Sequence, residues 1–337
     1  MLQNIDTLKN VPTWKSYNSN IAPTPDKTTE IAVLPLIKSS PTDYSTLYTA
    51  LCICQGISTS LTPGKRTIIT LDLQLYIKAM QLSSKEEISK NYIFRIGELH
   101  AVFAMSKAIG RYIENSGLDQ LFVHCGIYGP NTLGQILEGK HMKQWVAAAS
   151  ILYSSLFDVL SSAFFEVRED MKLLVQHIIV PILTIIQIDP TAIKEQHSVL
   201  VTRLEEKEYY NTFGKFRDGL KNEVKYISNV MRMIETLFLF IRSTRQELWE
   251  LQLVSLDRYT KYYFSLDLTN YARMTPIYLS QMYDLQESDP DTWYFLKENF
   301  WCRKSLKPFT AIGVDHALEQ VNKELKVVGG IFGLPEH

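Results

Sequence analysis

Apolar and polar residues alternate in blocks along residues 31–117, and the blocks have the lengths of strands and helices. Short apolar runs at residues 31–37 (IAVLPLI), 66–72 (RTIITLD) and 92–97 (YIFRIG) predict three strands. Each run is followed by a stretch whose apolar residues recur at helical spacing. Alternating strands and helices of this size predict a parallel sheet with crossover helices.

The boundaries of the predicted helices are marked by capping residues. Asp43 follows a polar turn and is placed as the N-cap of a helix over residues 44–57. Asp72 ends the second strand, and a helix begins directly after it. The third helix covers residues 99–113, and Gly117 is placed as its C-terminal stop.

The pattern becomes almost wholly helical over residues 129–300. The most hydrophobic stretch of the chain lies here, at residues 173–188, and contains Pro181. It is shorter than a membrane span requires and is interrupted by polar residues. We therefore expect a buried core helix, kinked or broken at Pro181, and no membrane partner.

A strand-like run returns at residues 309–314 (FTAIGV), and a helix start follows at Asp315. The predicted fold class is α/β and mostly helical, with a partial parallel or mixed sheet and a large all-α insertion. Four segments result: an irregular arm over 1–30, the first part of an α/β core over 31–128, the helical insertion over 129–300, and the return to the core with a Gly-rich tail over 301–337.

Composition narrows the class of protein. Hydrophobic residues make up 46% and charged residues 21%, which is enough apolar surface for a sizeable core. The 35 basic residues nearly balance the 36 acidic ones, which argues against a dedicated nucleic-acid-binding module but leaves room for a local patch. The four scattered cysteines and the polar N-terminus predict a nuclear or cytoplasmic protein that is not secreted.

Four residues follow predicted strands and form the candidate site: Asp72, His100, Asp315 and Glu319. Ligands of open α/β sheets bind at the carboxyl ends of strands, and carboxylates gathered there can hold two divalent metals. Asp72 and Glu319 are the expected metal ligands, with Mg²⁺ or Mn²⁺ as the cofactor. Taken singly, each residue is better explained structurally: the acids cap helices or complement helix dipoles, and the histidine is a satisfied structural one.

The order of these residues along the chain resembles a known family. Residues 69–80 (ITLDLQLYIKAM) resemble the second-aspartate segment of Mutator-like DDE transposases, and residues 34–51 resemble the third strand and following helix of their core. Residues 97–100 (GELH) match the histidine but not the cysteine of the family's C-x-x-H signature. Residues 319–322 (EQVN) are similar to its third-acid helix. The resemblance implies an RNase H-like core, a long helical insertion, and a catalytic role for Asp72, Glu319, Asp315 and His100.

The chain also looks like transposon-derived animal proteins, through residues 97–110, 114–121 (ENSGLDQL), 270–279 (NYARMTPIYL) and 315–330. It departs from the family at the first aspartate, because neither Asp6 nor Asp26 follows a strand. The resemblance therefore predicts that the first two strands of the core are missing, as in an N-terminally truncated or domesticated derivative.

Two functions follow from this resemblance. In the favoured one, the chain is a catalytically inactive, transposase-derived scaffold or interaction protein, with exposed aromatic residues as its working surface: Tyr262, Tyr263, Tyr271, Tyr278, Trp293 and Trp301. In the alternative, it is a metal-dependent DNA strand-transfer or nuclease core using Asp72 and Glu319, whose third carboxylate comes from Asp43 or a partner chain. DNA and a second copy of the chain are the expected partners.

One further motif resembles a phosphate-binding loop. Residues 62–67 (TPGKRT) contain the Gly-Lys pair of such a loop, but Thr59 stands where its first glycine belongs. The pattern is therefore too incomplete to predict a nucleotide-hydrolysing enzyme.

Overall fold

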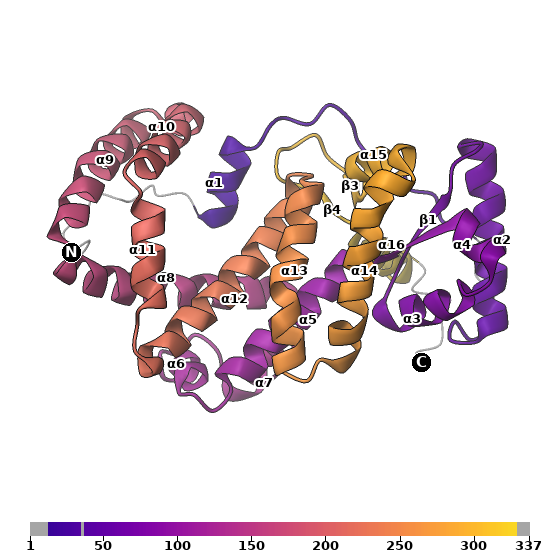
Figure 1. Ribbon diagram of the computed structural model, residues 1–337, viewed down its shortest axis with the longest axis horizontal. Coiled ribbons are helices and arrows are strands. Elements are labelled where there is room, and N and C mark those ends of the chain that lie inside the picture. Colours follow the sequence, from indigo (N-terminus) through magenta and orange to yellow (C-terminus); the bar gives the residue numbers. More distant parts are fainter. Residues whose placement is uncertain (1–12, 35–36, 329–337) are drawn as a thin grey trace. The chain divides into compact units, whose positions relative to one another are not determined.

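The computed structural model describes residues 13–34 and 37–328 (Figure 1). Helices account for most of these residues, and the strands form two small sheets. The chain divides into two compact units, which are described separately. An α/β unit comprises residues 27–142, 236–306 and 310–337, and a helical unit comprises residues 1–26, 143–235 and 307–309. The predicted insertion over 129–300 is thus divided between the two units.

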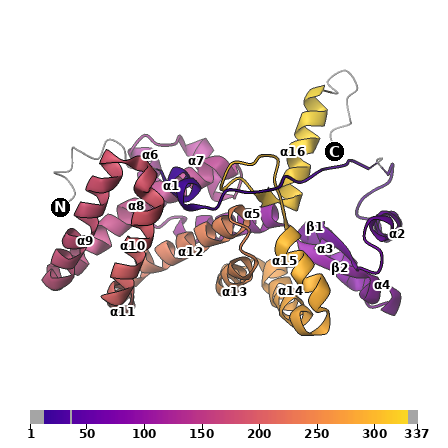
Figure 2. The ribbon, with the colours of Figure 1, turned by 90° about the horizontal axis from the view of Figure 1, so that it is seen from above.

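The α/β unit contains the predicted parallel pair of strands. β1 (Thr67–Leu71) pairs in parallel with β2 (Tyr92–Ile96), and all five residues of β2 are buried. The crossover between them is made by α3 (Leu73–Leu82) and α4 (Glu86–Asn91), which Figure 2 shows beside the strands. The apolar runs and the helical spacing of this segment therefore predicted β1, β2 and α3, including the strand end just before Asp72, whereas α4 was not predicted.

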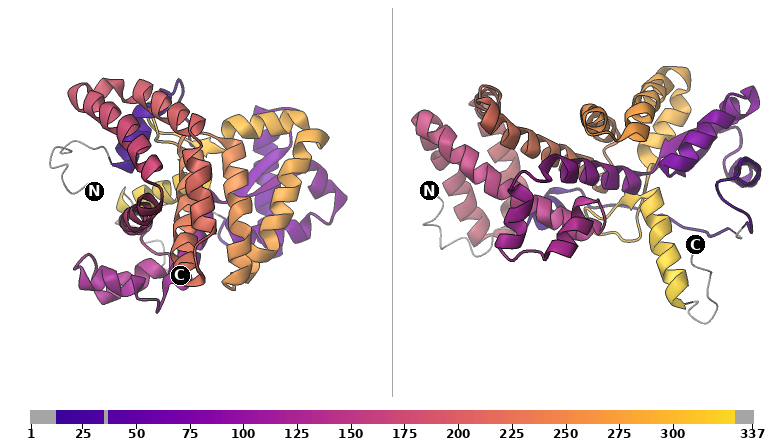
Figure 3. Two further views of the ribbon diagram at one scale, coloured as in Figure 1. Left: turned by 60° about the vertical axis from the view of Figure 1, so that its left-hand side comes forward. Right: turned by 90° about the horizontal axis from the view of Figure 1, so that it is seen from below.

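Helices cover this sheet. α2 (Tyr44–Leu61) contacts β1 and α3, and the buried helix α5 (Glu98–Ile113) follows β2. The helices α13 (Trp249–Ser265) and α14 (Thr269–Ser288) lie side by side in Figure 3, and α14 contacts α15 (Pro290–Asn299). The short helices α6 (Leu118–His124) and α7 (Pro130–Leu137) complete this layer.

One predicted capping position is confirmed and one needs correction. Asp43 is the N-cap residue of α2, as predicted, although its exposed side chain makes no capping hydrogen bond. Gly117 does not end α5, which stops at Ile113. It has a φ of 89° and begins α6, a left-handed conformation that glycine adopts without a steric cost.

The predicted first strand, residues 31–37, is wrong over its described part. Residues 31–34 have no regular secondary structure, and residues 35–36 lie outside the described residues. Ile31, Val33 and Leu34 are all exposed. An apolar run becomes a strand only when a neighbouring strand pairs with it, and this segment has no such neighbour among the described residues.

The predicted last strand also differs from the structure. Only Ile312–Gly313 is a strand (β4), and it pairs antiparallel with β3 (Trp301–Cys302) in a sheet separate from β1 and β2. The sheets therefore contain parallel and antiparallel pairs, but no single sheet unites the segments. α16 (Val314–Val328) follows β4 where a helix start was predicted, and the Gly-rich tail lies outside the described residues.

The helical unit packs around aromatic side chains. It contains α1 (Trp14–Ile21), α8 (Met142–Val167), α9 (Glu169–Ile188), the 3₁₀ turn Pro190–Ala192, α10 (Ile193–Glu206), α11 (Tyr209–Asp218) and the first part of α12 (Asn222–Arg245). Phe164 is fully buried, and its ring lies 5.2 Å from Phe213, 5.2 Å from Phe216 and 6.2 Å from Tyr209. Helical spacing on α8 and α11 brings these rings together.

The predicted core helix at residues 173–188, buried and kinked or broken at Pro181, is wrong in its burial and is not broken. α9 is one helix that contains Pro181, and only 11% of its most apolar stretch is buried. Its buried residues are Ile178 and Ile182, and α9 contacts α10. α8 and α9 are both long and apolar enough to cross a membrane, but two such helices are weak evidence because core helices of soluble proteins meet the same criteria.

Candidate functional site

The carboxylate of Asp315 joins the N-terminal turns of α16 and α5. His100 Nδ1 lies 3.0 Å from Asp315 Oδ2. The same carboxylate accepts hydrogen bonds from the backbone N–H of Leu99 at 2.9 and 3.1 Å, of His100 at 3.2 Å and of His316 at 2.9 Å. α5 receives no side-chain cap from its own N-cap residue, so Asp315 satisfies its free amides from across the unit.

Two glycines make room for this carboxylate. A Cβ at Gly97 would lie 2.8 Å from Asp315 Cγ, and a Cβ at Gly313 would lie 2.8 Å from Asp315 Oδ1 and 2.7 Å from the Cβ of Glu98. Atoms in real proteins rarely approach so closely. Because Gly97 has a φ of −63°, its requirement for glycine comes from packing and not from backbone strain.

The electrostatics of the pair favour its charged form. Burial tends to raise the pKa of Asp315, but hydrogen bonds from His100 and from the amides of Leu99 and His100 outweigh it, so the pKa lies below its usual range. The hydrogen bond to Asp315 raises the pKa of His100 against the effect of burial. The side chain of His100 is 37% exposed, whereas that of Asp315 is 8% exposed.

The two predicted metal ligands lie near this pair without contacting it directly. The negative charges of Asp72 and Glu319 both contribute to the raised pKa of His100. Asp72 is half-buried and caps α3, since its Oδ1 accepts the Leu75 N–H at 2.8 Å. Glu319 is half-buried on α16 beyond the first turn, where it is too far along the helix for the predicted dipole role.

The structure therefore brings together the four predicted site residues only in part. His100 and Asp315 are hydrogen-bonded, and Asp72 and Glu319 act on them through charge. Within residues 13–34 and 37–328, no group of three or more His, Cys, Asp or Glu side chains is placed to hold a metal ion. Asp43, the predicted source of a third carboxylate, is exposed on its own helix end, and Asp6 lies outside the described residues.

Sequence reasoning missed a buried ion pair beside the site. Arg95 of β2 and Glu98 of α5 form an ion pair with side chains 1% and 4% exposed. The Arg95 guanidinium also donates to Thr70 Oγ1 at 3.3 Å and to the Phe300 carbonyl at 3.2 Å, and it lies 5.5 Å from the Trp249 ring. An arginine inside an apolar strand, followed by Glu three residues later, was the available signal.

Glu98 is incompletely neutralised by its partner. Burial raises the pKa of Glu98, the positive charge of Arg95 opposes this shift, and the nearby Asp315 adds to it. Glu98 Oε2 has no hydrogen-bond partner among the described residues. Burying an oxygen without a hydrogen-bond partner costs free energy. The ion pair with Arg95 and the close packing of Glu98 against Gly313 hold the side chain in this position.

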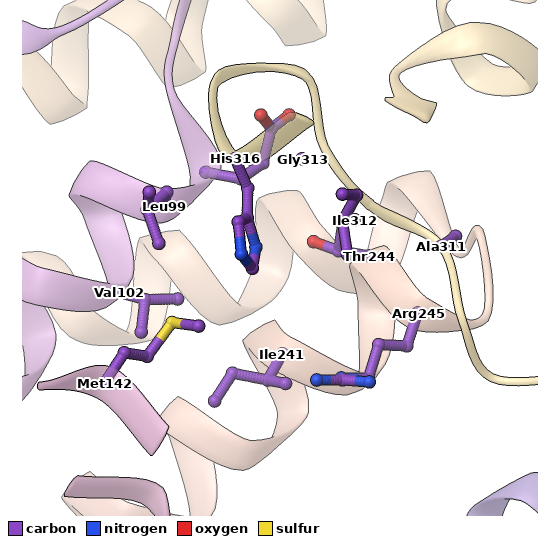
Figure 4. A pocket seen from close by; sticks show the side chains of 11 residues that line it. Leu99, Val102, Met142, Ile241, Thr244, Arg245, Ala311, Ile312, Gly313 and His316 are labelled. Atoms are coloured by element: carbon purple, nitrogen blue, oxygen red, sulfur yellow. The ribbon is translucent and has the colours of Figure 1, made fainter. Parts of the chain in front are cut away.

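A small cavity lies beside these residues (Figure 4). It has a volume of about 40 Å³ and is bordered by Leu99, Val102, Ile241 and His316, with Arg245 at one side. Burial lowers the pKa of Arg245. The space suits a few water molecules and is too small for an organic substrate.

Comparisons with known proteins give a family and no activity. No curated protein and no solved structure matches the chain. One family model, described as a domain of unknown function (DUF8702), matches residues 13–336. Because this match covers nearly the whole chain, both compact units and the candidate site lie within it. The chain belongs to this DUF8702 family of unknown function.

Proposed function

We propose that the chain is a transposase-derived protein that has kept an RNase H-like core of the Mutator-like DDE type and now serves as an interaction scaffold. The proposal rests on the segments that resemble the transposases. Asp72 ends a strand, His100 lies in the first helical turn after the next strand, and Glu319 lies in the helix after the last strand. The negative charges of Asp72 and Glu319 both contribute to the raised pKa of His100.

The observation that carries the non-catalytic part of the proposal is the hydrogen bonding of Asp315. Its two carboxylate oxygens accept bonds from three backbone amides and contact the ring nitrogen of His100. A metal or substrate would have to replace these bonds, which are strong because the acceptor is charged. Asp315 and Asp72 thus act in this proposal as helix caps that hold the core together.

The interaction surface needs a different location from the one predicted. Of the six aromatic residues expected at the surface, Tyr263, Tyr278, Trp293 and Trp301 are buried, because helical packing turns them into the core. Exposed apolar side chains instead gather on α8 and α9 of the helical unit: Ile151, Val159, Val167, Leu173, Val180, Ile185 and Ile188. Exposed apolar side chains in such number are typical of surfaces that bind other proteins or membranes, and the scaffold proposal takes the first of these.

The test is a DNA cleavage and strand-transfer assay. The wild type and the variants Asp72→Asn and Glu319→Gln are incubated with duplex oligonucleotides and Mg²⁺ or Mn²⁺. A scaffold gives no cleavage above the level of the two variants. Cleavage by the wild type that disappears in both folded variants would overturn the proposal.

A second candidate function, the metal-dependent nuclease or strand-transferase, is favoured by one observation. The carboxylates of Asp72 and Glu319 both act on His100, whose Nδ1 is oriented by Asp315. An imidazole held in this way is a common metal ligand or general base, because a carboxylate on one nitrogen raises the basicity of the other. This function needs another carboxylate, from Asp43 or from a second copy of the chain, and Mg²⁺ or Mn²⁺ as cofactor.

A further inference from the structure

A second cavity lies at the loop that resembles a phosphate-binding loop. It has a volume of about 140 Å³ and is located between the end of α2, the loop before β1 and the first part of α15. Ser58 and Thr62 border it from α2 and its C-cap, Lys65 and Arg66 from the loop, and Phe295 from α15. All of these residues belong to the α/β unit. Two cations and two hydroxyl groups therefore surround one concave space.

The cationic groups of this cavity are only partly used by the protein. Lys65 is exposed, forms no ion pair within the described residues, and places its Nζ 5.2 Å from the centre of the Phe295 ring. Arg66 is anchored, because it donates to the carbonyls of Ser89 at 2.6 Å and Tyr92 at 2.8 Å. Its buried Nε, however, has no hydrogen-bond partner within residues 13–34 and 37–328.

The neighbouring acid does not cancel this positive charge. Asp289 lies 3.9 Å from Arg66, but its carboxylate also caps α15 by accepting the Thr292 N–H at 3.2 Å and the Thr292 hydroxyl at 2.7 Å. Burial lowers the pKa of Arg66 and Asp289 only partly offsets the effect. Arg66 is thus a partly buried cation with one weak ionic partner, and an added anion would stabilise it.

We propose that this cavity binds the phosphate group of a small phosphorylated molecule. Lys65 and Arg66 supply charge-assisted donors, and the Ser58 hydroxyl, which makes no side-chain hydrogen bond within the described part, supplies another. Phe295 and Ile68 form an apolar wall against which the organic part of the ligand packs.

Two features separate this site from a true phosphate-binding loop. Thr59 lies within α2, so the chain has no glycine there to let backbone amides surround a phosphate. The C-terminal end of α2 also opposes an anion, although Thr62 covers the Ser58 carbonyl with hydrogen bonds from its backbone N–H at 2.7 Å and its hydroxyl at 3.0 Å. Side chains, and Lys65 above all, therefore carry the binding.

The shape and charge of the site favour a small ligand over a DNA backbone. Duplex DNA presents a row of phosphates and is bound by extended basic surfaces, whereas this site is one concavity in a chain with a formal net charge of −1. The negative charge of a single phosphate group is matched by the two cations that border the cavity, Lys65 and Arg66.

The experiment measures binding of inorganic phosphate, AMP and a short DNA duplex to the full chain by calorimetry and by chemical shifts. The test variant is Lys65→Met, which keeps the length of the side chain and removes the charge. Lys140→Met is the matched control, because Lys140 is an exposed lysine of the same unit that does not border the cavity. Ser58→Ala is the second test variant, and it leaves the anchored Arg66 undisturbed.

We expect saturable binding of phosphate and tighter binding of AMP. Lys65→Met should weaken both by about tenfold or more, as expected for loss of a charge-assisted donor, and Ser58→Ala by a smaller factor. Lys140→Met should leave both unchanged. The proposal is overturned if the wild type binds neither phosphate nor AMP, if only the duplex binds, or if the two lysine variants weaken binding equally.

Discussion

The two compact units share one means of stabilising their cores and differ in its reach. Each contains an ion pair with a buried arginine: Arg95 with Glu98 in the α/β unit, and Arg217 with Glu235 in the helical unit. The α/β unit adds the buried Asp315, whose carboxylate bonds residues 215 and 216 positions away, whereas Arg217 bonds residues 11 and 18 positions away. Because hydrogen bonds are directional, the carboxylate of Asp315 fixes elements that are far apart in the chain.

This difference matters for function. A charged residue that a fold needs for its own hydrogen bonds is less available for a ligand, and Asp315 is the clearest example. The exposed apolar side chains of α8 and α9, by contrast, form no hydrogen bonds that a partner would have to replace. In the proposed scaffold, Asp72 and Asp315 stabilise the fold, and the exposed sides of α8 and α9 are the surface proposed to bind a partner.

The largest expected effect is in the aromatic core. Phe164→Ala should lower the free energy of unfolding by about 3–5 kcal/mol, because it removes a fully buried ring and leaves a cavity. Urea unfolding measures the loss, and hydrogen exchange should show it first in α8 and α11. Val159→Ala on the exposed side of α8 is the control, and an equal loss in both variants would contradict an aromatic core centred on Phe164.

Removal of the charge on Asp315 comes next. Asp315→Asn should destabilise the protein by about 3 kcal/mol, because the amide cannot satisfy three backbone donors and His100 together. Glu319→Gln, a similar change on the same helix, should alter the unfolding free energy by less than about 0.5 kcal/mol. If Glu319→Gln is the more harmful of the two, Asp315 is not the residue that joins α5 and α16.

The close approach of Gly97 to Asp315 gives a third, smaller effect. Gly97→Ala should cost about 2 kcal/mol through crowding, since the new methyl group meets the Asp315 carboxylate. In an Asp315→Ala background the same substitution should cost much less, because the obstructing group is gone. A double-mutant cycle by urea unfolding measures this difference, and additive effects would show that another contact requires the glycine.

The smallest effect is the pH dependence of the His100–Asp315 pair. Because the pKa of His100 is raised, its contribution to the free energy of unfolding is complete below the ordinary histidine pKa of about 6.5 and is lost as pH rises through the folded-state pKa. Because the pKa of Asp315 is lowered, its contribution to the free energy of unfolding is present above about pH 4 and is lost as pH falls further. The pair is therefore most stabilising between these values.

His100→Gln tests this dependence. The variant should be less stable than the wild type by about 1 kcal/mol or less near pH 5, because the half-exposed histidine is partly screened by water, and the gap should narrow towards pH 8. Urea unfolding of the wild type and the variant at pH 5 and at pH 8 measures this difference in unfolding free energy. A gap that widens with rising pH would show that the neutral histidine makes the stabilising contact.

The sequence predicted the elements whose pattern is local. The strands ending at Ile96 and Leu71, and the helix after Gly97, follow from apolar periodicity over a few residues. Residues 31–34 have the same apolar character and form no strand, because pairing depends on a neighbour that a single segment cannot reveal. The burial of α9 was misjudged for a related reason, since composition does not show how many sides of a helix are covered.

The candidate site was predictable in its members and not in their roles. Asp72, His100 and Asp315 were selected because each follows a strand, and all three do, although the strand before Asp315 belongs to a separate sheet. The bond between Asp315 and the Leu99 amide joins residues 216 positions apart, and no local pattern encodes it. Arg95 and Glu98 were missed because their importance comes from complete burial, which depends on the helices that cover β2.

The most direct test of the account is Mn²⁺ binding by calorimetry to the wild type, Asp72→Ala and Glu319→Ala. The proposed scaffold uses Asp72 as a helix cap and has no metal for Glu319 to bind, so we predict no saturable binding that depends on either residue. Tight binding by the wild type that is lost in both folded variants would contradict it, and would establish the acidic cluster as a metal centre.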